Sequence, residues 1–324
     1  MKPFHSFAML AAIAAVGQAF AVDATTTPVG YESLPLTAGF NYVGLRLQSP
    51  VVVAGKLTAV TATSISDSSV NFGTLLTGTS TYILEVTNAN GVTQEFLGSS
   101  ASGSTITLPV DLTSKAAVND SYKIRAAATL NSVFGASNSA GLGTGFFGPG
   151  TDLVYLPNGA GGFDQYYYDD GQATWADINA NPVNGAQVAI PYSDSVILSL
   201  GAPVNLVVSG EVKTTATAYA LTANSFNYTG SVYPAGSTLA SAFNAALPNI
   251  DKGFFGPAGD IFYVSNGAGG FNQYYYDDGQ ASWADINANP VDATTISLPS
   301  GVVIYNDGAA ANLVASAPAS YSSL

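Results

Sequence analysis

A near-identical repeat constrains this sequence more than any other feature. Residues 145–183 and 253–291 are identical at 31 of 39 positions when they are aligned at an offset of 108. Weaker similarity on both sides extends the unit to about 80 residues, and a solenoid needs at least three such units. Because only two copies are present, the repeat favours two packed modules.

Short strand patterns fill the rest of the chain and favour an all-β fold. Runs rich in Val, Ile, Thr and Tyr are separated by Gly, Asn, Ser or Pro, as in VVVAGKLTAV, TYILEV, SYKIRA and SVILSL. Residues 237–247 have apolar side chains at helical spacing and predict a short helix or turn. We therefore expect two tandem, internally duplicated modules, sandwich-like or barrel-like, built from short antiparallel strands and hairpins.

The chain divides into three predicted parts. Residues 1–21 have Lys2 near the start, an apolar run and a small-residue site, which predict a secretory signal peptide. Residues 22–205 form the first β module, with a longer strand-rich insert through about residue 127, and residues 206–324 form the second. The boundary depends on LVVSGEVKTT resembling VVVAGKLTAV, so that each module would open with a Gly-interrupted strand.

The repeated tyrosines predict a hairpin. Asp170-Gly171 and Asp278-Gly279 favour a two-residue type I′ turn, which needs positive φ at both central residues. That turn would place Tyr166 opposite Trp175, and Tyr274 opposite Trp283 in the second copy. Cross-strand aromatic packing then explains the tyrosines without a ligand.

Two further parts of the repeat predict turns. NGAGGF (158–163 and 266–271) supplies residues that tolerate left-handed backbone, as a longer hairpin loop requires. Pro149 and Pro257 follow glycine in FFGPG and FFGPA, which also indicates a turn.

Composition excludes several kinds of chemistry. The chain has no cysteine, and its one histidine, His5, lies in the predicted signal peptide. Ser-His-Asp catalysis, thiol chemistry and zinc sites are therefore not expected. Without Lys2, seven basic residues face 21 acidic ones, so nucleic acid would be repelled. We predict no catalytic residue, no metal site, no cofactor and no transmembrane helix.

The repeated carboxylates favour structural roles. Adjacent strand residues point to opposite faces, so neither Asp169-Asp170 nor Asp277-Asp278 suits an acid/base pair. The two DINANP segments, which begin at Asp177 and Asp285, place oxygen atoms at positions one, three and five of a calcium loop.

That segment lacks the other requirements of a calcium loop. It has proline where the loop needs glycine, and Val188 or Ile296 where it needs a bidentate glutamate. An Asx-type turn is favoured, and structural calcium remains the alternative. Trp175 and Trp283 are assigned to the core or an interface, with stacking on sugar rings as the alternative.

The chain also resembles a known family. TTPVGYESLPLTAG, the Thr-Leu-x-Ser-x-Phe element, DLVYLPNGAGGFDQYYYDDGQATW and the closing IP…VI…APVNLVVSG are similar to a family of secreted, β-rich, highly paralogous proteins of unknown function from Verrucomicrobia- and Planctomycetes-type bacteria. The resemblance covers most of the mature chain and implies export and a β fold. It carries no catalytic residue, and this sequence departs from the family's single-unit layout by repeating the core.

Two functional hypotheses follow. The first is a non-enzymatic structural protein of the cell surface or extracellular matrix that assembles with itself or with envelope components. The second is a carbohydrate-binding surface protein that uses aromatic faces, with structural calcium as an option. Both expect export to the surface or medium, with the periplasm as an alternative.

Overall fold

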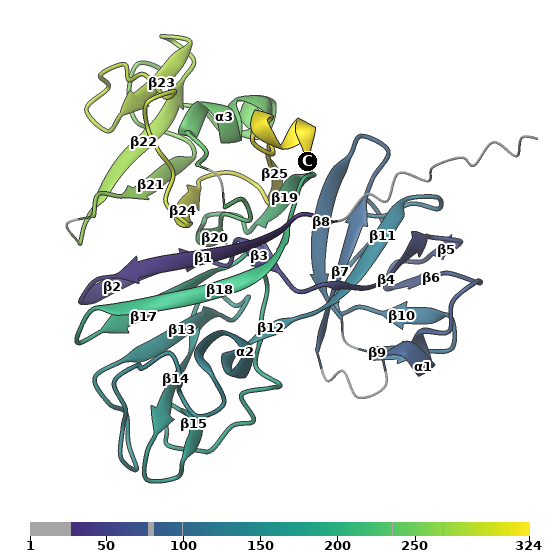
Figure 1. Ribbon diagram of the computed structural model, residues 1–324. Helices are drawn as coiled ribbons and strands as arrows, with labels where there is room; N and C mark the ends of the chain where they lie inside the picture. The colour runs from purple at the N-terminus through teal and green to yellow at the C-terminus, as the bar shows by residue number, and fades with distance from the viewer. Residues whose placement is uncertain (1–26, 77–80, 99, 235, 268) are drawn as a thin grey trace, which may run out of the picture.

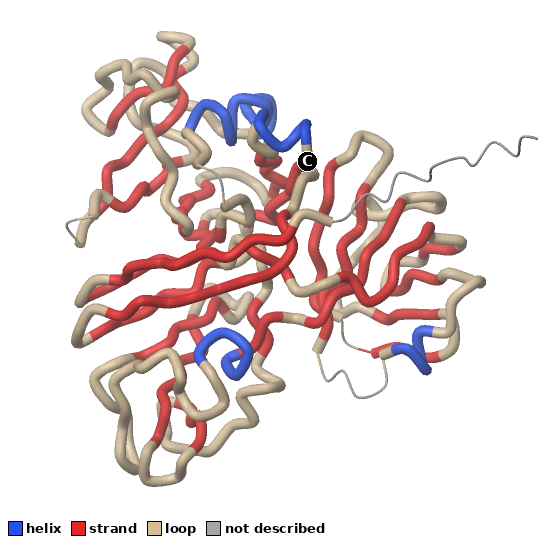
Figure 2. The backbone as a smooth tube through the Cα atoms, viewed as in Figure 1, coloured by secondary structure: helices blue, strands red, loops and turns tan. Residues whose placement is uncertain are grey.

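The structure is a computed structural model that describes residues 27–324, except residues 77–80, 99, 235 and 268. The predicted signal peptide, residues 1–21, lies outside the described residues. Strands dominate the described chain and almost all of them pair antiparallel, so the prediction of an all-β protein is confirmed (Figure 2). Within the described part of the chain, no helix has both the length and the apolar character needed to cross a bilayer.

Three sheets form one side of the molecule in Figure 1. Sheet A contains, in spatial order, β1 (Val29–Leu36), β18 (Val204–Val212) and β3 (Leu47–Gln48). Sheet B contains β15 (Thr174–Asp177), β14 (Phe163–Asp169), β13 (Leu153–Pro157), β17 (Ser195–Leu200) and β2 (Gly39–Gly44). Sheet F contains β20 (Ser225–Gly230), β24 (Gly301–Asn306), β21 (Ile261–Ser265), β22 (Phe271–Asp277) and β23 (Ser282–Asp285).

The other elements complete the fold. Sheet C contains β25 (Ala311–Ala315), β19 (Ala216–Leu221), β8 (Val92–Leu97), β7 (Tyr82–Thr87), β11 (Ser121–Ala126) and β4 (Val51–Lys56). Sheet D contains β5 (Ala59–Val60), β6 (Ser64–Ser66), β10 (Thr105–Thr107) and β9 (Ser100–Ser102), and sheet E contains β12 (Ala128–Thr129) and β16 (Ala189–Ile190). The helical segments are α1 (Phe72–Leu75), α2 (Leu130–Phe134), α3 (Leu239–Phe243), η1 (Asn244–Asn249) and η2 (Ala319–Ser323).

The Thr-Leu-x-Ser-x-Phe elements are helix starts. Thr129 caps α2 by accepting a hydrogen bond from the Ser132 amide, and the Ser132 hydroxyl accepts one from the Thr129 amide. Thr238 and Ser241 make the same capping box at α3. The box satisfies amides that a helix start leaves free. The short helix predicted within residues 237–247 is confirmed by α3 and η1.

The two repeat copies have the same strand pairing. β13, β14, β15 and β17 occupy the same order in sheet B as β21, β22, β23 and β24 do in sheet F. Registers agree as well, since Tyr155 pairs with Gln165 and Tyr263 pairs with Gln273. Equal registers are expected when the same apolar residues must face a core. Duplication of one ancestral module stays a prediction.

One strand, β18, crosses the predicted module boundary between residues 205 and 206. β18 pairs with β1 from Val204 to Glu211. β2 extends sheet B beside β17, and β20 extends sheet F beside β24. LTAGFNYVG (36–44) is therefore matched by LTANSFNYTG (221–230), a similarity that the sequence prediction missed.

The predicted equivalence of VVVAGKLTAV and LVVSGEVKTT is wrong. The first run begins with β4, at the edge of sheet C, and the second lies in β18, at the centre of sheet A. Apolar strands that contain a glycine look alike in sequence. Only their partners distinguish them, because β4 pairs with β11 and β18 pairs with β1 and β3.

The strand-rich insert has a core of its own. Residues 51–126 contain sheet D and four strands of sheet C, packed around side chains that include Ile65, Phe72, Leu84 and Tyr122. Sheet C is shared, because β8 of the insert pairs in parallel with β19 of the second module. The insert is thus joined to the second module by backbone hydrogen bonding.

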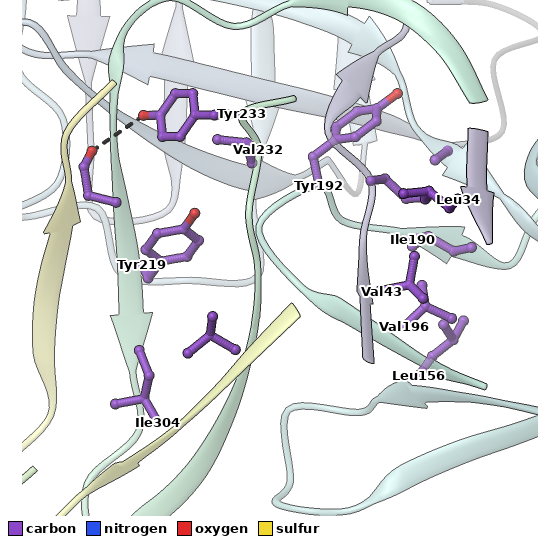
Figure 3. Packing of buried hydrophobic residues seen from close by; sticks show 14 of the residues in the cluster. Leu34, Val43, Leu156, Ile190, Tyr192, Val196, Tyr219, Val232, Tyr233 and Ile304 are labelled. Carbon is purple, nitrogen blue, oxygen red and sulfur yellow. Dashed lines mark hydrogen bonds between the residues drawn. The ribbon is translucent and has the colours of Figure 1, made fainter. Parts of the chain in front are cut away.

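A larger core is built from residues of sheets A, B and F together with strands β7, β19 and β25 of sheet C. It includes Leu34, Val43, Tyr219 and Ile304 from four strands and Tyr192 from the turn before β17, all labelled in Figure 3. At its centre, a Cβ on Gly44 would overlap the backbone of Ser300 and Ser231. Glycine here lets the edges of sheets B and F approach at backbone distance.

Candidate functional site

The repeated hairpin has a different register from the predicted one. Tyr168 pairs with Trp175 and Tyr166 pairs with Asp177, so the loop has four residues, from Asp170 to Ala173. The second copy pairs Tyr276 with Trp283 and Tyr274 with Asp285. The predicted two-residue turn is wrong because the positive φ falls on Ala173 (53°) and Ala281 (50°) and on neither Gly171 nor Gly279. Each tryptophan still pairs with a tyrosine across the hairpin, but the partner is two residues further along the chain than the predicted one.

One aspartate of each doublet holds this loop together. The Asp169 carboxylate is buried and accepts hydrogen bonds from the amides of Phe147 and Gly171 and from the Gln172 side chain. Burial raises its pKa, but these hydrogen bonds outweigh burial and hold the pKa below the usual value. The Asp277 carboxylate accepts the equivalent hydrogen bonds from the amides of Phe255 and Gly279 and from the Gln280 side chain. The aspartates therefore position turn backbone, as the sequence predicted.

The second aspartate of each doublet faces solvent. The Asp170 carboxylate accepts a hydrogen bond from the Thr144 hydroxyl at 2.7 Å, and Asp278 forms an ion pair with Lys252 at 3.1 Å. The two members of a doublet thus lie in different environments. Neither doublet forms an acid/base pair.

Each hairpin end presents two exposed phenylalanines. Phe146, Phe147, Phe254 and Phe255 expose 63–75% of their surface. Phe147 and Phe255 have φ of 51°, a region that costs a bulky residue free energy. The Asp169 and Asp277 carboxylates hold this backbone through the Phe147 and Phe255 amides. We call residues 145–149 and 253–257 the diphenylalanine tips.

The DINANP segments form Asx turns. One Asp177 oxygen accepts hydrogen bonds from the amides of Asn179 and Asn181, and the Asn181 side chain donates to both oxygens. The Asn181 contacts in particular hold the pKa of Asp177 low. Asp285 is bonded in the same way by Asn287 and Asn289. N–H donors surround the carboxylate where a calcium loop would supply oxygen atoms.

Both tryptophans lie in the core. Trp175 is 1% exposed and donates from its indole nitrogen to the Gly135 carbonyl, and Trp283 is 4% exposed and donates to the Asn244 side chain. Neither indole presents a face to solvent. Sugar stacking, if present, uses other rings.

Such rings form a band on the outer faces of sheets B and F. Along β13, Val154 and Leu156 point into the core while Tyr155 points outward. We call this band the aromatic belt. It has two halves, and the centroids of neighbouring rings within each half lie 4.7–6.3 Å apart. The halves are Phe40–Tyr155–Phe163–Tyr228 and Tyr42–Phe271–Tyr263–Phe226–Tyr305. Burial and then the Tyr228 hydroxyl raise the pKa of Tyr42. All nine rings are half-buried or exposed.

A cavity of about 440 Å³ adjoins the belt. We call it the cleft; it lies between β20, strands β8 and β19 of sheet C, and two loops of the first module. Residues that line it include Glu95, Gly161, Asp194, Tyr219, Phe226 and Tyr228. No sequence motif connects Glu95 with Asp194, so this site was not predicted.

The two cleft carboxyls titrate near neutral pH. Burial raises the pKa of Glu95 to about 8 and that of Asp194 to about 7. Asp194 and Glu85 also raise the pKa of Glu95, while Lys213 lowers it. The fold therefore favours the protonated form of both groups.

The protein should accordingly lose stability as pH rises from 5 to 8. Unfolded carboxyls titrate near pH 4, so the contribution of these raised groups is complete below that value and is lost as pH rises through 7 and 8. Urea unfolding at pH 5, 6.5 and 8 measures the change. The double variant E95Q/D194N should flatten the profile, whereas D111N, at an exposed turn, should leave it unchanged. A wild-type profile that is flat or rises over this range contradicts the prediction.

A buried ionic cluster joins the insert to sheet A. Arg125 contacts Glu85 at 2.8 Å and Glu211 at 2.5 Å, and Lys213 contacts Glu85 at 2.7 Å. Burial opposes ionisation of Glu85, but Lys213 and Arg125 outweigh it and lower the Glu85 pKa to about 2. Every charge in the cluster has a partner, which identifies it as a structural device.

Comparison with protein-family models, curated proteins and solved structures finds no match to this chain. The resemblance to a secreted bacterial family stays a prediction. Function is therefore argued from the tips, the belt and the cleft.

Proposed function

We propose that the mature chain is an exported, non-enzymatic assembly protein of the bacterial surface or extracellular matrix. The diphenylalanine tips carry this proposal. Each tip holds apolar rings in solvent on a backbone that a buried aspartate fixes, and exposed apolar surface of this kind is a frequent mark of association. We infer that copies contact one another through these tips.

The placement of the tips supports propagation. Gly145 bridges Asp169 at the end of β14, and Gly253 bridges Asp277 at the end of β22. The hairpins β14–β15 and β22–β23 lie at opposite ends of the molecule in Figure 1. Two like contacts at opposite ends produce a chain of copies unless the geometry closes a ring.

Removing the outer phenylalanine of both tips should abolish assembly. F146S and F254S remove exposed rings, whereas Phe147 and Phe255 lie over Gly171 and Gly279 and are left in place. Wild-type protein comprising residues 22–324 should sediment as oligomers in sedimentation velocity experiments. It should appear as filaments or layers in negative-stain electron microscopy. Association should be stronger in high salt or near the acidic isoelectric point, because repulsion from the net negative charge is then weaker.

The variants separate the two tips. F146S alone should stop growth at dimers, and F146S/F254S should be monomeric, with at least tenfold weaker association. V118S, at an exposed apolar residue of the insert, should assemble like the wild type. A wild-type chain that stays monomeric at every salt concentration and pH rules out the assembly function.

The aromatic belt favours a second function, carbohydrate binding. Its partly exposed rings form an apolar surface with the amides of Gln165 and Gln273 on the same sheet faces. Rings that pack on sugar C–H faces, with amides that bond hydroxyls, suit an extended neutral glycan. Tyr155 and Tyr263, in equivalent registers, are the central residues of this surface.

A further inference from the structure

The cleft has the size and wall of a small-molecule site. Its volume of about 440 Å³ lies within the roughly 300–1,000 Å³ range of ligand pockets. One wall is the edge strand β20, which has a neighbour in sheet F on one side only, β24. The opposite wall comes from β8 and β19, and the glycine-rich loop Asn158–Gly162 borders the cleft.

Aromatic rings connect the cleft to the belt. Phe226 is 48% exposed and lies 5.6 Å from Tyr263 and 5.0 Å from Tyr305. Tyr228 contacts Phe163 edge-on at 4.7 Å. A chain-like ligand can therefore pass from the belt into the cleft over one apolar surface.

The cleft is lined by two carboxyls and by neutral polar side chains such as Gln94, Asn227 and Thr229, with no cation among the lining residues. Glu95 accepts hydrogen bonds from the amides of Tyr192 at 2.7 Å and Ser193 at 3.4 Å. Among the described residues, no group donates a hydrogen bond to the Asp194 carboxylate. Asp194 thus has hydrogen-bonding capacity that the fold leaves unused.

The geometry points to a neutral saccharide as the ligand of the cleft, with its ring face on Phe226 and Tyr228 and its hydroxyls bonded to Asp194 and Glu95. An anionic sugar is disfavoured by both carboxyls and by the net negative charge of the chain. A protonated carboxyl can both donate and accept a hydrogen bond, and a sugar hydroxyl can do the same, so the two groups suit each other. Because burial favours this form, binding should weaken as pH rises through 7 and 8. Lys213, Glu85 and Asp194 are the charged groups that act on Glu95.

This inference rests on the carbohydrate-binding function and is tested with residues 22–324. Cellohexaose, xylohexaose, mannohexaose and chitohexaose are titrated calorimetrically at pH 6 and pH 9. We expect at least one of them to bind, with an affinity at least tenfold higher at pH 6. D194A should weaken binding at pH 6 at least tenfold. D194N, which imitates the neutral carboxyl, should retain it and reduce the dependence on pH.

The belt variant Y155A distinguishes this inference from the function on which it rests, because Tyr155 is outside the cleft lining. Binding that Y155A weakens and D194A leaves unchanged keeps carbohydrate binding and overturns the cleft as its site. Absence of binding by all four hexasaccharides overturns both. Spermidine serves as a cationic probe of the same cleft. If it binds more tightly at pH 9 than at pH 6 and D194A abolishes its binding, the cleft is a cation site and the inference is overturned. Circular dichroism spectra that match the wild type exclude misfolding as the cause.

Discussion

Replacing Arg125 with methionine should lower the free energy of unfolding by about 3–5 kcal/mol. The guanidinium bonds Glu85, Glu211 and the Ser49 carbonyl, and its removal leaves two buried carboxylates with too few cations. The loss should be largest near neutral pH. It should shrink as pH falls below about 4.5, because Glu85 stabilises the fold only above its unfolded pKa and loses that contribution as pH falls toward 2.

A matched control exists on the same strand. Lys123 lies two residues before Arg125 on β11 and is exposed, so K123M should change stability by less than about 0.5 kcal/mol. Urea unfolding followed by circular dichroism compares the two variants. Equal effects of R125M and K123M would contradict a structural role for the cluster.

Because the cluster links β7 and β11 to β18, R125M should also increase protease cleavage between the insert and sheet A.

Replacing either tryptophan with alanine should cost about 3–5 kcal/mol of stability. Trp175 packs on Phe134 at 5.8 Å and Tyr168 at 5.7 Å, and Trp283 packs on Phe262 at 5.2 Å and Tyr276 at 5.8 Å. W175F and W283F retain most of the ring and lose the indole hydrogen bond, so each should cost less than the alanine variant.

The sequence supplies a convenient readout. The chain has two tryptophans, so each variant leaves one as a fluorescence reporter of unfolding. Denaturation midpoints in urea measure the loss for each copy separately. Unchanged midpoints together with lost hexasaccharide binding would assign the indoles to a sugar platform and contradict their placement in the core.

The candidate sites differ in how far the sequence predicts them. The turn role of Asp169 and Asp277 and the Asx turn at Asp177 depend on neighbours within a few residues, and both were predicted. The exact partner of Trp175 was not predicted, because register depends on which residue takes positive φ. That residue is Ala173 and not Gly171, although glycine adopts positive φ more readily.

The belt was detectable only in part. Phe40 and Tyr42 alternate in FNY, and the same letters recur at Phe226 and Tyr228, so a comparison of residues 36–44 with 221–230 would have found both edge strands. Nothing local indicates that Tyr228 meets Phe163 of the other repeat copy. Pairing across copies depends on the close approach of sheets B and F at Gly44.

The sequence by itself determined most of the strands, the short helix within residues 237–247 and the Asx turns of the repeat, because each depends on residues that are neighbours along the chain. Tertiary structure alone decided which strands share sheet C and that Glu95 and Asp194 face one cleft. Those features depend on contacts between residues about a hundred positions apart. Apolar patterning specifies that a strand is buried, but the packing of all strands together selects its neighbour.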